Sequence, residues 1–191
     1  MALALLAATP TARAQDSRFD ASLQASLTQH ETFDETDFGG GAQLSYRLTG
    51  WLAIDAHLNW FPKDLGDPAF SSSRTQGLVG LKVGKDLARS SVYGAVRPGF
   101  LRFGEAPEAF ACILIFPPPL ACSLAGGETT FALDLAAGYQ ALAGDDVVVR
   151  LELGDGMVRY PGPAIDGDGE AHQDAFWKHG LRVTLAVGWR F

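Results

Sequence analysis

The sequence predicts an all-β protein, namely an eight-stranded antiparallel up-and-down transmembrane β-barrel. Two patterns support this fold class: apolar and polar residues alternate in eight segments, and the connectors alternate between long and short. Alternation with period two is typical of strands, whose successive side chains point to opposite faces. A transmembrane barrel turns its apolar face to lipid and its polar face inward. A spanning helix is excluded, because prolines at 117–119 interrupt the longest apolar stretch, 109–125.

The C-terminal segment has the clearest alternation. One face carries Leu181, Val183, Leu185, Val187, Trp189 and Phe191, and the other carries Arg182, Thr184, Ala186, Gly188 and Arg190. An aromatic-bounded apolar face opposite arginines and small residues is what a wall between lipid and a wet interior requires. We therefore expect an eighth strand over 176–191.

Seven earlier segments show the same pattern. In each of them, aliphatic and aromatic residues share the outward face, and polar residues and glycines share the inward face. The expected strands cover 18–33, 39–48, 52–60, 76–84, 91–103, 130–140 and 147–154. Within the fifth segment, Pro98 cannot donate to a strand ladder, so we expect a bulge or a distortion there.

The connectors separate the two ends of the predicted barrel. Those at 31–37, 62–73, 104–128 and 161–174 are long or polar, whereas 49–50, 85–90 and 143–145 are short. Aromatic residues gather near both levels. We expect Phe33, Phe38, Trp60, Phe61, Phe103, Tyr160, Phe176 and Trp177 at the long-loop level, and Phe19, Tyr46, Trp51, Trp189 and Phe191 at the other. Two such levels are typical of interfacial girdles.

Composition and the N-terminus favour one exported domain. The chain has 191 residues and a formal net charge of −7, which argues against a nucleic-acid partner. Residues 1–14 combine an apolar run with an Ala-x-Ala site, so we expect a signal peptide there and a barrel domain over 15–191. In an oxidising compartment, Cys112 and Cys122 would close a disulfide easily.

Together, these features make the chain resemble the small bacterial outer-membrane β-barrel proteins of the OmpA/OmpX type. The resemblance rests on the signal-like start, the eight alternating segments, the alternation of long and short connectors and the last strand. It covers nearly the whole mature chain. It implies a location in the outer membrane, contact with outer-membrane lipid and lipopolysaccharide, and no cofactor. It also implies that Trp189 and Phe191 belong to the signal recognised by the barrel-assembly machinery.

Charged residues on the inward faces are the main candidates for a functional network. They are Arg47, Asp55, His57, Lys82, Arg97, Asp134, Arg150, Glu152, Lys178, Arg182 and Arg190. Buried charges persist when they are paired, so one interpretation is a salt-bridged lumen that is mostly closed. The alternative is a narrow or gated pore for water, ions or small solutes.

The loop 104–128 is the most unusual connector, because it is apolar and rich in proline. It could fold over the barrel mouth or onto the outer leaflet, or it could form a preorganised contact site for a surface partner. In either role, this loop would be the part of the chain that specifies its function.

Enzymatic and metal sites receive less support. The four histidines, His30, His57, His172 and His179, allow a lipid-modifying barrel enzyme, but no Gly-x-Ser-x-Gly motif accompanies them. We therefore expect no catalytic residues. Asp166, Asp168 and Glu170 resemble the start of a calcium loop, yet Trp177 stands where the bidentate acid belongs. Weak divalent-cation binding and a flexible acidic loop both remain open.

Overall fold

The computed structural model describes residues 18–30, 35–62, 73–105 and 116–191. Eight antiparallel strands form one closed barrel, in which each strand pairs with its sequence neighbour and β1 pairs with β10. The barrel strands are β1 (Phe19–His30), β2 (Glu35–Arg47), β3 (Leu52–Phe61), β4 (Arg74–Asp86), β5 (Ser90–Phe103), β6 (Thr129–Ala143), β7 (Val147–Tyr160) and β10 (Phe176–Arg190). The predicted eight-stranded antiparallel up-and-down barrel is confirmed.

Three short elements complete the described chain. They are helix α1 (Leu120–Leu124) and the strands β8 (Ala164–Ile165) and β9 (Ala171–His172), which pair with each other. No helix in the described ranges is long and apolar enough to cross a membrane.

The strand register determines the width of the barrel. Following paired residues from Phe19 through all eight strands leads back to Gln29, ten residues further along β1. A shift of this size in eight strands requires a steep tilt, of about 35–45° to the barrel axis. Such a barrel has a bore that side chains can fill completely. The inward side chains therefore decide whether anything passes.

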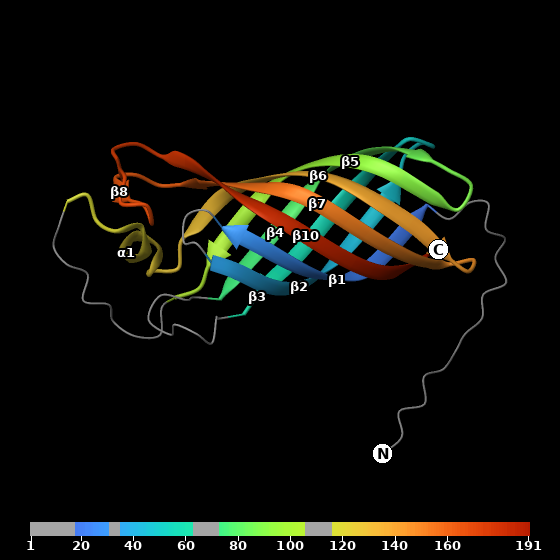
Figure 1. Cartoon of the computed structure of the whole chain (residues 1–191), viewed down its shortest axis with the longest axis horizontal. Coiled ribbons are helices and arrows are strands. Elements are labelled where there is room, and N and C mark those ends of the chain that lie inside the picture. Colours follow the sequence, from blue (N-terminus) through green and yellow to red (C-terminus); the bar gives the residue numbers. More distant parts are fainter. Residues whose placement is uncertain (1–17, 31–34, 63–72, 106–115) are drawn as a thin grey trace, which may run out of the picture.

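The two ends of the barrel differ in their connectors. The connectors 48–51, 87–89 and 144–146 lie at one end, together with the start of β1 and the end of β10; we call this the turn end. The opposite end, which we call the loop end, carries α1 and the β8–β9 hairpin (Figure 1). The first loop-end connector is shorter than expected, because β2 begins at Glu35 and leaves only 31–34 between the strands.

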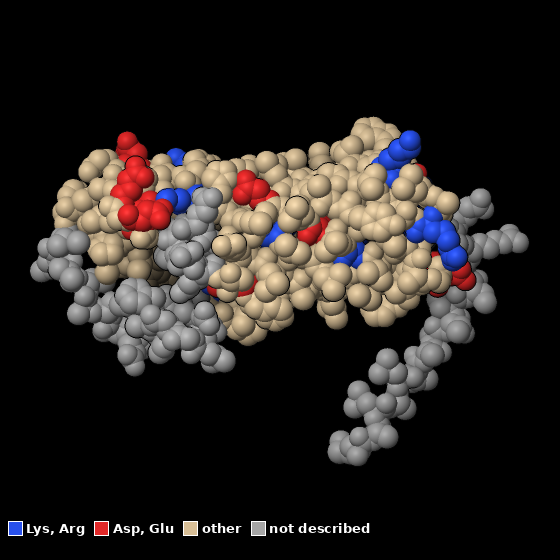
Figure 2. All heavy atoms as spheres, viewed as in Figure 1, with Lys and Arg blue, Asp and Glu red and all other residues tan. Residues whose placement is uncertain are grey.

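The outside of the barrel is apolar. Leu23, Leu58 and Leu185 are 69%, 57% and 53% exposed, and the other outward aliphatic residues follow the same pattern. On the face shown in Figure 2, most of the middle of the barrel is tan with small scattered red and blue patches, and larger charged groups lie near its ends. Burying this surface in lipid removes it from water, so the alternating pattern corresponds to a membrane-spanning wall.

The aromatic girdles need a correction. Phe38, Trp60 and Trp177 face outward at the loop end, and Trp51 and Trp189 do so at the turn end. Four residues expected at the loop-end level are instead buried inside the barrel: Phe61, Phe103, Tyr160 and Phe176. The physical reason is strand alternation, since each of them has the same parity as the polar inward residues of its own strand. Phe33 lies outside the described residues.

Pro98 introduces no bulge. The register between β4 and β5 is the same on both sides of it, from Leu78 opposite Gly99 to Leu81 opposite Val96. Only the two pairs between these points are missing from the ladder, and the register with β6 continues through Pro98. The distortion is therefore local. The expected signal peptide over 1–14 lies outside the described residues and stays a prediction, as do the bounds of the domain.

Candidate functional site

The centre of the lumen is organised around Arg97, which projects inward from β5 and is 0% exposed. Its Nη1 lies 2.8 Å from Asp134, its Nη2 lies 2.8 Å from Glu152, and its Nε donates to Asp55 at 2.7 Å. The three carboxylates come from three strands, β6, β7 and β3. A guanidinium has five donors in a rigid planar fork, so it can hold several carboxylates at once where a lysine could not.

A second set of side chains supports these carboxylates. Asp55 accepts bonds from Gln43 at 3.0 Å and from Ser45, and its Oδ2 lies 3.0 Å from Nε2 of His57. The Tyr93 hydroxyl donates to Glu152 at 2.7 Å. Buried polar groups of this kind are stable only when their hydrogen bonds are made, and here most of them are.

The formal charges at the centre balance. The three acids Asp55, Asp134 and Glu152 face three bases, of which Lys82 lies 3.8 Å from Asp55 and Arg182 lies 2.7 Å from Asp134. An electroneutral, hydrogen-bonded cluster of this kind presents no net charge to an ion in the lumen. We call these six residues, with Gln43, Ser45, His57 and Tyr93, the Arg97 cluster.

Other predicted network residues lie apart from it. Arg150 forms its own buried pair with Asp20 at 2.7 Å, nearer the turn end, and also donates to Gln140. Arg47 is not part of the central network, because it lies at the turn-end rim and pairs with Asp86 at 3.2 Å, where both side chains are partly exposed. Arg190 also lies near this rim, in the last strand position.

Sequence reasoning missed three lumen charges. Asp20 forms the pair just described, and Asp37 and Arg74 form a buried ion pair closer to the loop end. Asp37 was expected in an acidic turn, but β2 begins earlier than predicted and carries it inward. Extending the alternation of β2 and β4 by two residues would have placed both side chains inside, since Asp37 has the parity of Gly39 and Arg74 that of Gln76.

Arg182 is incompletely satisfied. It is buried and ion-paired with Asp134, but none of its three side-chain nitrogens has a hydrogen bond of good geometry, and the nearby Thr28 hydroxyl also lacks a partner. Buried donors of this kind are usually hydrated. The lumen above the Arg97 cluster therefore offers places for water.

An apolar cluster closes the lumen toward the loop end. Leu101, Phe103, Val158, Tyr160 and Phe176 project into the mouth from β5, β7 and β10. Leu120 and Leu124 of α1 pack among them and are 2% and 5% exposed. The described part of the loop 104–128 thus lies over the mouth, which is one of the positions expected from the sequence. We call residues 116–128 the lid. Cys112 lies outside the described residues, so its disulfide with Cys122 stays a prediction.

The β8–β9 hairpin is attached to this lid. The backbone N–H of Ile165 donates to the carbonyl of Pro118 at 2.9 Å, and Ala164 is fully buried in the apolar cluster. The ring of His172 stacks on Phe176 at 3.8 Å between centroids. Two loops far apart in the sequence therefore form one cover.

The candidate metal residues lie in this hairpin. Asp166 Oδ1 accepts the backbone N–H groups of Asp168 and Glu170, and its Oδ2 lies 2.9 Å from His172 and 2.8 Å from Lys178. The ammonium of Lys178 is also 2.8 Å from Asp168. Burial raises the pKa of Asp166, but the bonds from Lys178, His172 and Glu170 outweigh it and hold that pKa below its ordinary value. Lys178 and His172 thus occupy the Asp166 oxygen that a metal ion would need, and the exposed acids around it keep a net negative charge.

The histidines described in the structure are each bonded to an acid. His57 pairs with Asp55, His172 with Asp166, and His179 with Asp155 at 2.8 Å. In the described ranges, no serine hydroxyl bonds to a histidine, so the arrangement of a serine hydrolase is not formed there. The side chain of His30 lies outside the described residues.

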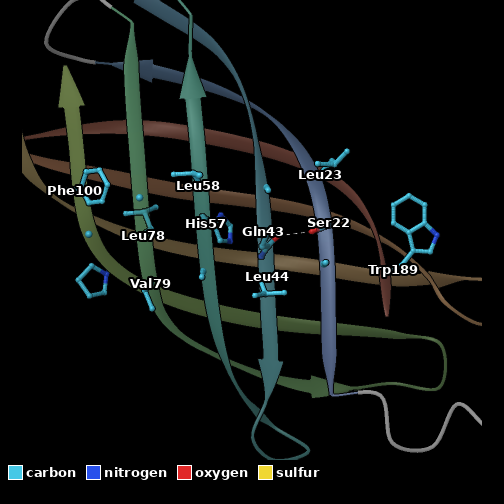
Figure 3. Close-up of a pocket in the computed structure, with 16 residues that line it drawn as sticks. Ser22, Leu23, Gln43, Leu44, His57, Leu58, Leu78, Val79, Phe100 and Trp189 are labelled. Atoms are coloured by element: carbon cyan, nitrogen blue, oxygen red, sulfur yellow. Dashed lines mark hydrogen bonds between the residues drawn. The ribbon is translucent and has the colours of Figure 1, made fainter. Parts of the chain in front are cut away.

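A hollow lies on the outer wall. It has a volume of about 630 Å³ and crosses β1 to β5, where small outward residues such as Ala42 and Gly77 lie among larger ones. Leu58 and Phe100 project beside it, whereas His57 and the hydrogen-bonded pair Ser22 and Gln43 belong to the lumen side (Figure 3). This hollow is part of the lipid-facing wall, and hydrocarbon chains would fill it.

Comparisons with known proteins agree with this architecture. The chain is similar to neisserial surface protein A, with a TM-score of 0.58, 12% identity and coverage of 91% of this chain and 96% of that one. Ail of Yersinia pestis, crystallised with the heparin analogue sucrose octasulfate, has a TM-score of 0.51, 12% identity and coverage of 92% and 97%. OprG of Pseudomonas aeruginosa has a TM-score of 0.51, 9% identity and coverage of 93% and 98%. No protein-family model and no curated protein matches the chain. The shared property is the fold of small outer-membrane barrels.

Proposed function

We propose that this barrel, which has the fold of small outer-membrane proteins, is a bacterial outer-membrane protein with a closed lumen and a surface-interaction role. The turn end faces the periplasm and the loop end faces the cell exterior, as expected for short turns and longer loops. In this orientation the barrel anchors the protein, and the cover formed by 116–128 and 161–175 meets external partners. The observation that supports the proposal best is the Arg97 cluster.

Two barriers in series support the closed lumen. An ion entering from the turn end meets the Arg97 cluster, whose charges are balanced and mutually bonded. An ion entering from the loop end meets the apolar cluster around Tyr160, capped by Leu120 and Leu124. Displacing either barrier would require breaking buried pairs or exposing buried apolar surface, and both are costly.

The chemistry of the loop end restricts its partner. Phe116 is 77% exposed on the cover, and Asp168, Glu170 and Asp174 are exposed beside the hairpin. Ail was crystallised with a polysulfated ligand, but these carboxylates would repel such a polyanion. A partner with an apolar contact and neutral or basic groups fits this surface better.

Planar-bilayer recording of the refolded protein tests the closed lumen. We expect no steady conductance for the wild type, and none for L120D/L124D, because that variant releases the cover but keeps the Arg97 cluster. Steady conductance of the wild type would overturn the closed-lumen proposal. Deleting residues 113–120 and measuring adhesion tests the surface role: adhesion that survives this deletion would place the contact outside the loop.

A narrow or gated pore is the second candidate. The unbonded nitrogens of Arg182 and the hydroxyl of Thr28 favour it, since they create a site for water between the two barriers. Brief openings in the same recordings that become more frequent in L120D/L124D would support this pore. Their absence in both proteins would exclude it.

A further inference from the structure

Charged side chains are rare on the outward faces of the barrel strands. By alternation, the described strands turn only five Lys, Arg, His, Asp or Glu side chains outward: Lys85, Arg102, Asp155, Arg159 and His179. All but Lys85 lie on β5, β7 and β10, toward the loop end. A lipid-facing Arg or Lys is costly at the bilayer midplane and tolerated near the interface, so Arg102 and Arg159 lie at a depth where the membrane tolerates them.

The two arginines lie among aromatic residues of the girdle. Arg159 of β7 is paired with Phe131 of β6 on one side and with Trp177 of β10 on the other, and these rings contact edge to face at 5.8 Å. Arg102 extends the group onto β5, two residues beyond Phe100, which is paired with Phe131. Both arginines are exposed.

Neither guanidinium is neutralised by the protein. Within the described ranges, Arg102 and Arg159 make no ion pair and no side-chain hydrogen bond. The one outward acid on these strands, Asp155, is bonded to His179 at 2.8 Å. The group therefore keeps two unpaired positive charges, on a protein whose net charge is −7.

We propose that Arg102, Phe131, Arg159 and Trp177, which we call the outer arginine patch, bind the phosphorylated headgroup of lipopolysaccharide in the outer leaflet. This proposal rests on the outer-membrane location proposed above. A guanidinium fork matches phosphate oxygens and can bind them bidentately. Aromatic girdles lie at the level of lipid headgroups, which places the two arginines at the depth of the phosphates.

The position of the patch favours a lipid over a soluble anion. Below it, and beyond the bonded pair of Asp155 and His179, Leu153 and Val183 continue the outward wall, which suits acyl chains. Beyond it at the loop end, the exposed acids Asp168 and Glu170 oppose the approach of anions from solution. A phosphate that arrives within the membrane avoids these carboxylates.

Native mass spectrometry of the full chain, refolded in a neutral detergent, tests the proposal. The probes are lipid A with both phosphates and the same lipid after enzymatic removal of the phosphates. We expect the wild type to bind the phosphorylated form at least about tenfold more tightly, since each interfacial arginine contributes appreciably to anionic-lipid binding. R102Q/R159Q should lose this preference. R102K/R159K should keep an intermediate one, because lysine retains the charge without the fork.

K85Q is the matched control, since Lys85 is also outward and exposed but lies at the turn end. It should keep the wild-type preference. Because the substituted side chains are exposed, every variant should show the heat-dependent gel shift of a folded barrel. Equal binding of both lipid forms by the wild type, or an unchanged preference in R102Q/R159Q, would overturn the proposal. A conducting lumen would overturn only the proposed function, since conductance does not enter this measurement.

Discussion

Removing one carboxylate from the Arg97 cluster should destabilise the barrel strongly. In E152Q, the volume is preserved but one negative charge is lost, and the cluster retains Asp55 and Asp134 against Lys82, Arg97 and Arg182. Glu152 accepts bonds from Arg97 at 2.8 and 3.1 Å and from the Tyr93 hydroxyl at 2.7 Å. The substituted amide would also present N–H groups to a guanidinium that can only donate.

The expected size of this effect follows from these contacts. Removing one partner of a buried ion pair costs about 3–5 kcal/mol. Arg97 keeps two of its three carboxylates, so we expect the lower end of that range, about 3 kcal/mol. Two lost hydrogen bonds to charged groups, at about 1.5–3 kcal/mol each, give a similar value.

Urea unfolding of the barrel in lipid vesicles, followed by tryptophan fluorescence, measures this loss. The control is D145N, the same acid-to-amide change at an exposed position of the β6–β7 turn, which should alter the free energy of unfolding by less than about 0.5 kcal/mol. If E152Q loses less than about 1 kcal/mol with an unchanged denaturant slope, then the Arg97 cluster does not stabilise the lumen as we have argued.

Three further predictions concern other parts of the molecule. G80A should cost about 3 kcal/mol in the same urea assay, because a Cβ at Gly80 would lie 1.9 Å from the carbonyl oxygen of Val96. A Cβ at Gly50 would have no atom within 4 Å, so the control G50A should be neutral. Equal losses in the two variants would contradict this. Y93F should cost about 1 kcal/mol, the value of one net hydrogen bond, and no loss would mean that its 2.7 Å contact contributes nothing. The pKa of Asp166 is lowered in the folded hairpin, so its stabilisation is complete above the ordinary value of 3.8 and is lost as the pH falls through the lowered pKa. The NMR shift of the Asp166 carboxyl carbon should therefore show its own titration midpoint below 3.8, and a midpoint at or above 3.8 would refute this.

Strand positions and faces were largely predictable, because they depend on local alternation. Asp55, Arg97 and Glu152 could each be placed inside from their own strand, since one face of a pleated segment is enough to define the other. Some errors arose where strands continued beyond the expected ends, since Asp37 and Tyr160 lie on extensions of β2 and β7. Phe176 lies within the expected eighth strand, but its aromatic side chain suggests a girdle, whereas its parity places it in the lumen.

The partners of the lumen charges could not be predicted. The pairing of Arg97 with acids from β3, β6 and β7 depends on the register of all eight strands, and a shift of two residues in one of them would exchange one carboxylate for another. The same holds for α1, whose five residues carry no signal that they pack against Tyr160, which is separated from them by a whole hairpin.

The sequence by itself determined that this protein is a barrel with an apolar outside and a charged inside, because period-two alternation is a property of neighbouring residues. The tertiary structure alone decided how the inside is filled. This filling depends on the ten-residue shift around the barrel, which brings six charges from six strands into one balanced cluster, and on two distant loops that meet over the mouth. Contacts of this kind follow from the closed geometry of the whole sheet and are absent from any single strand.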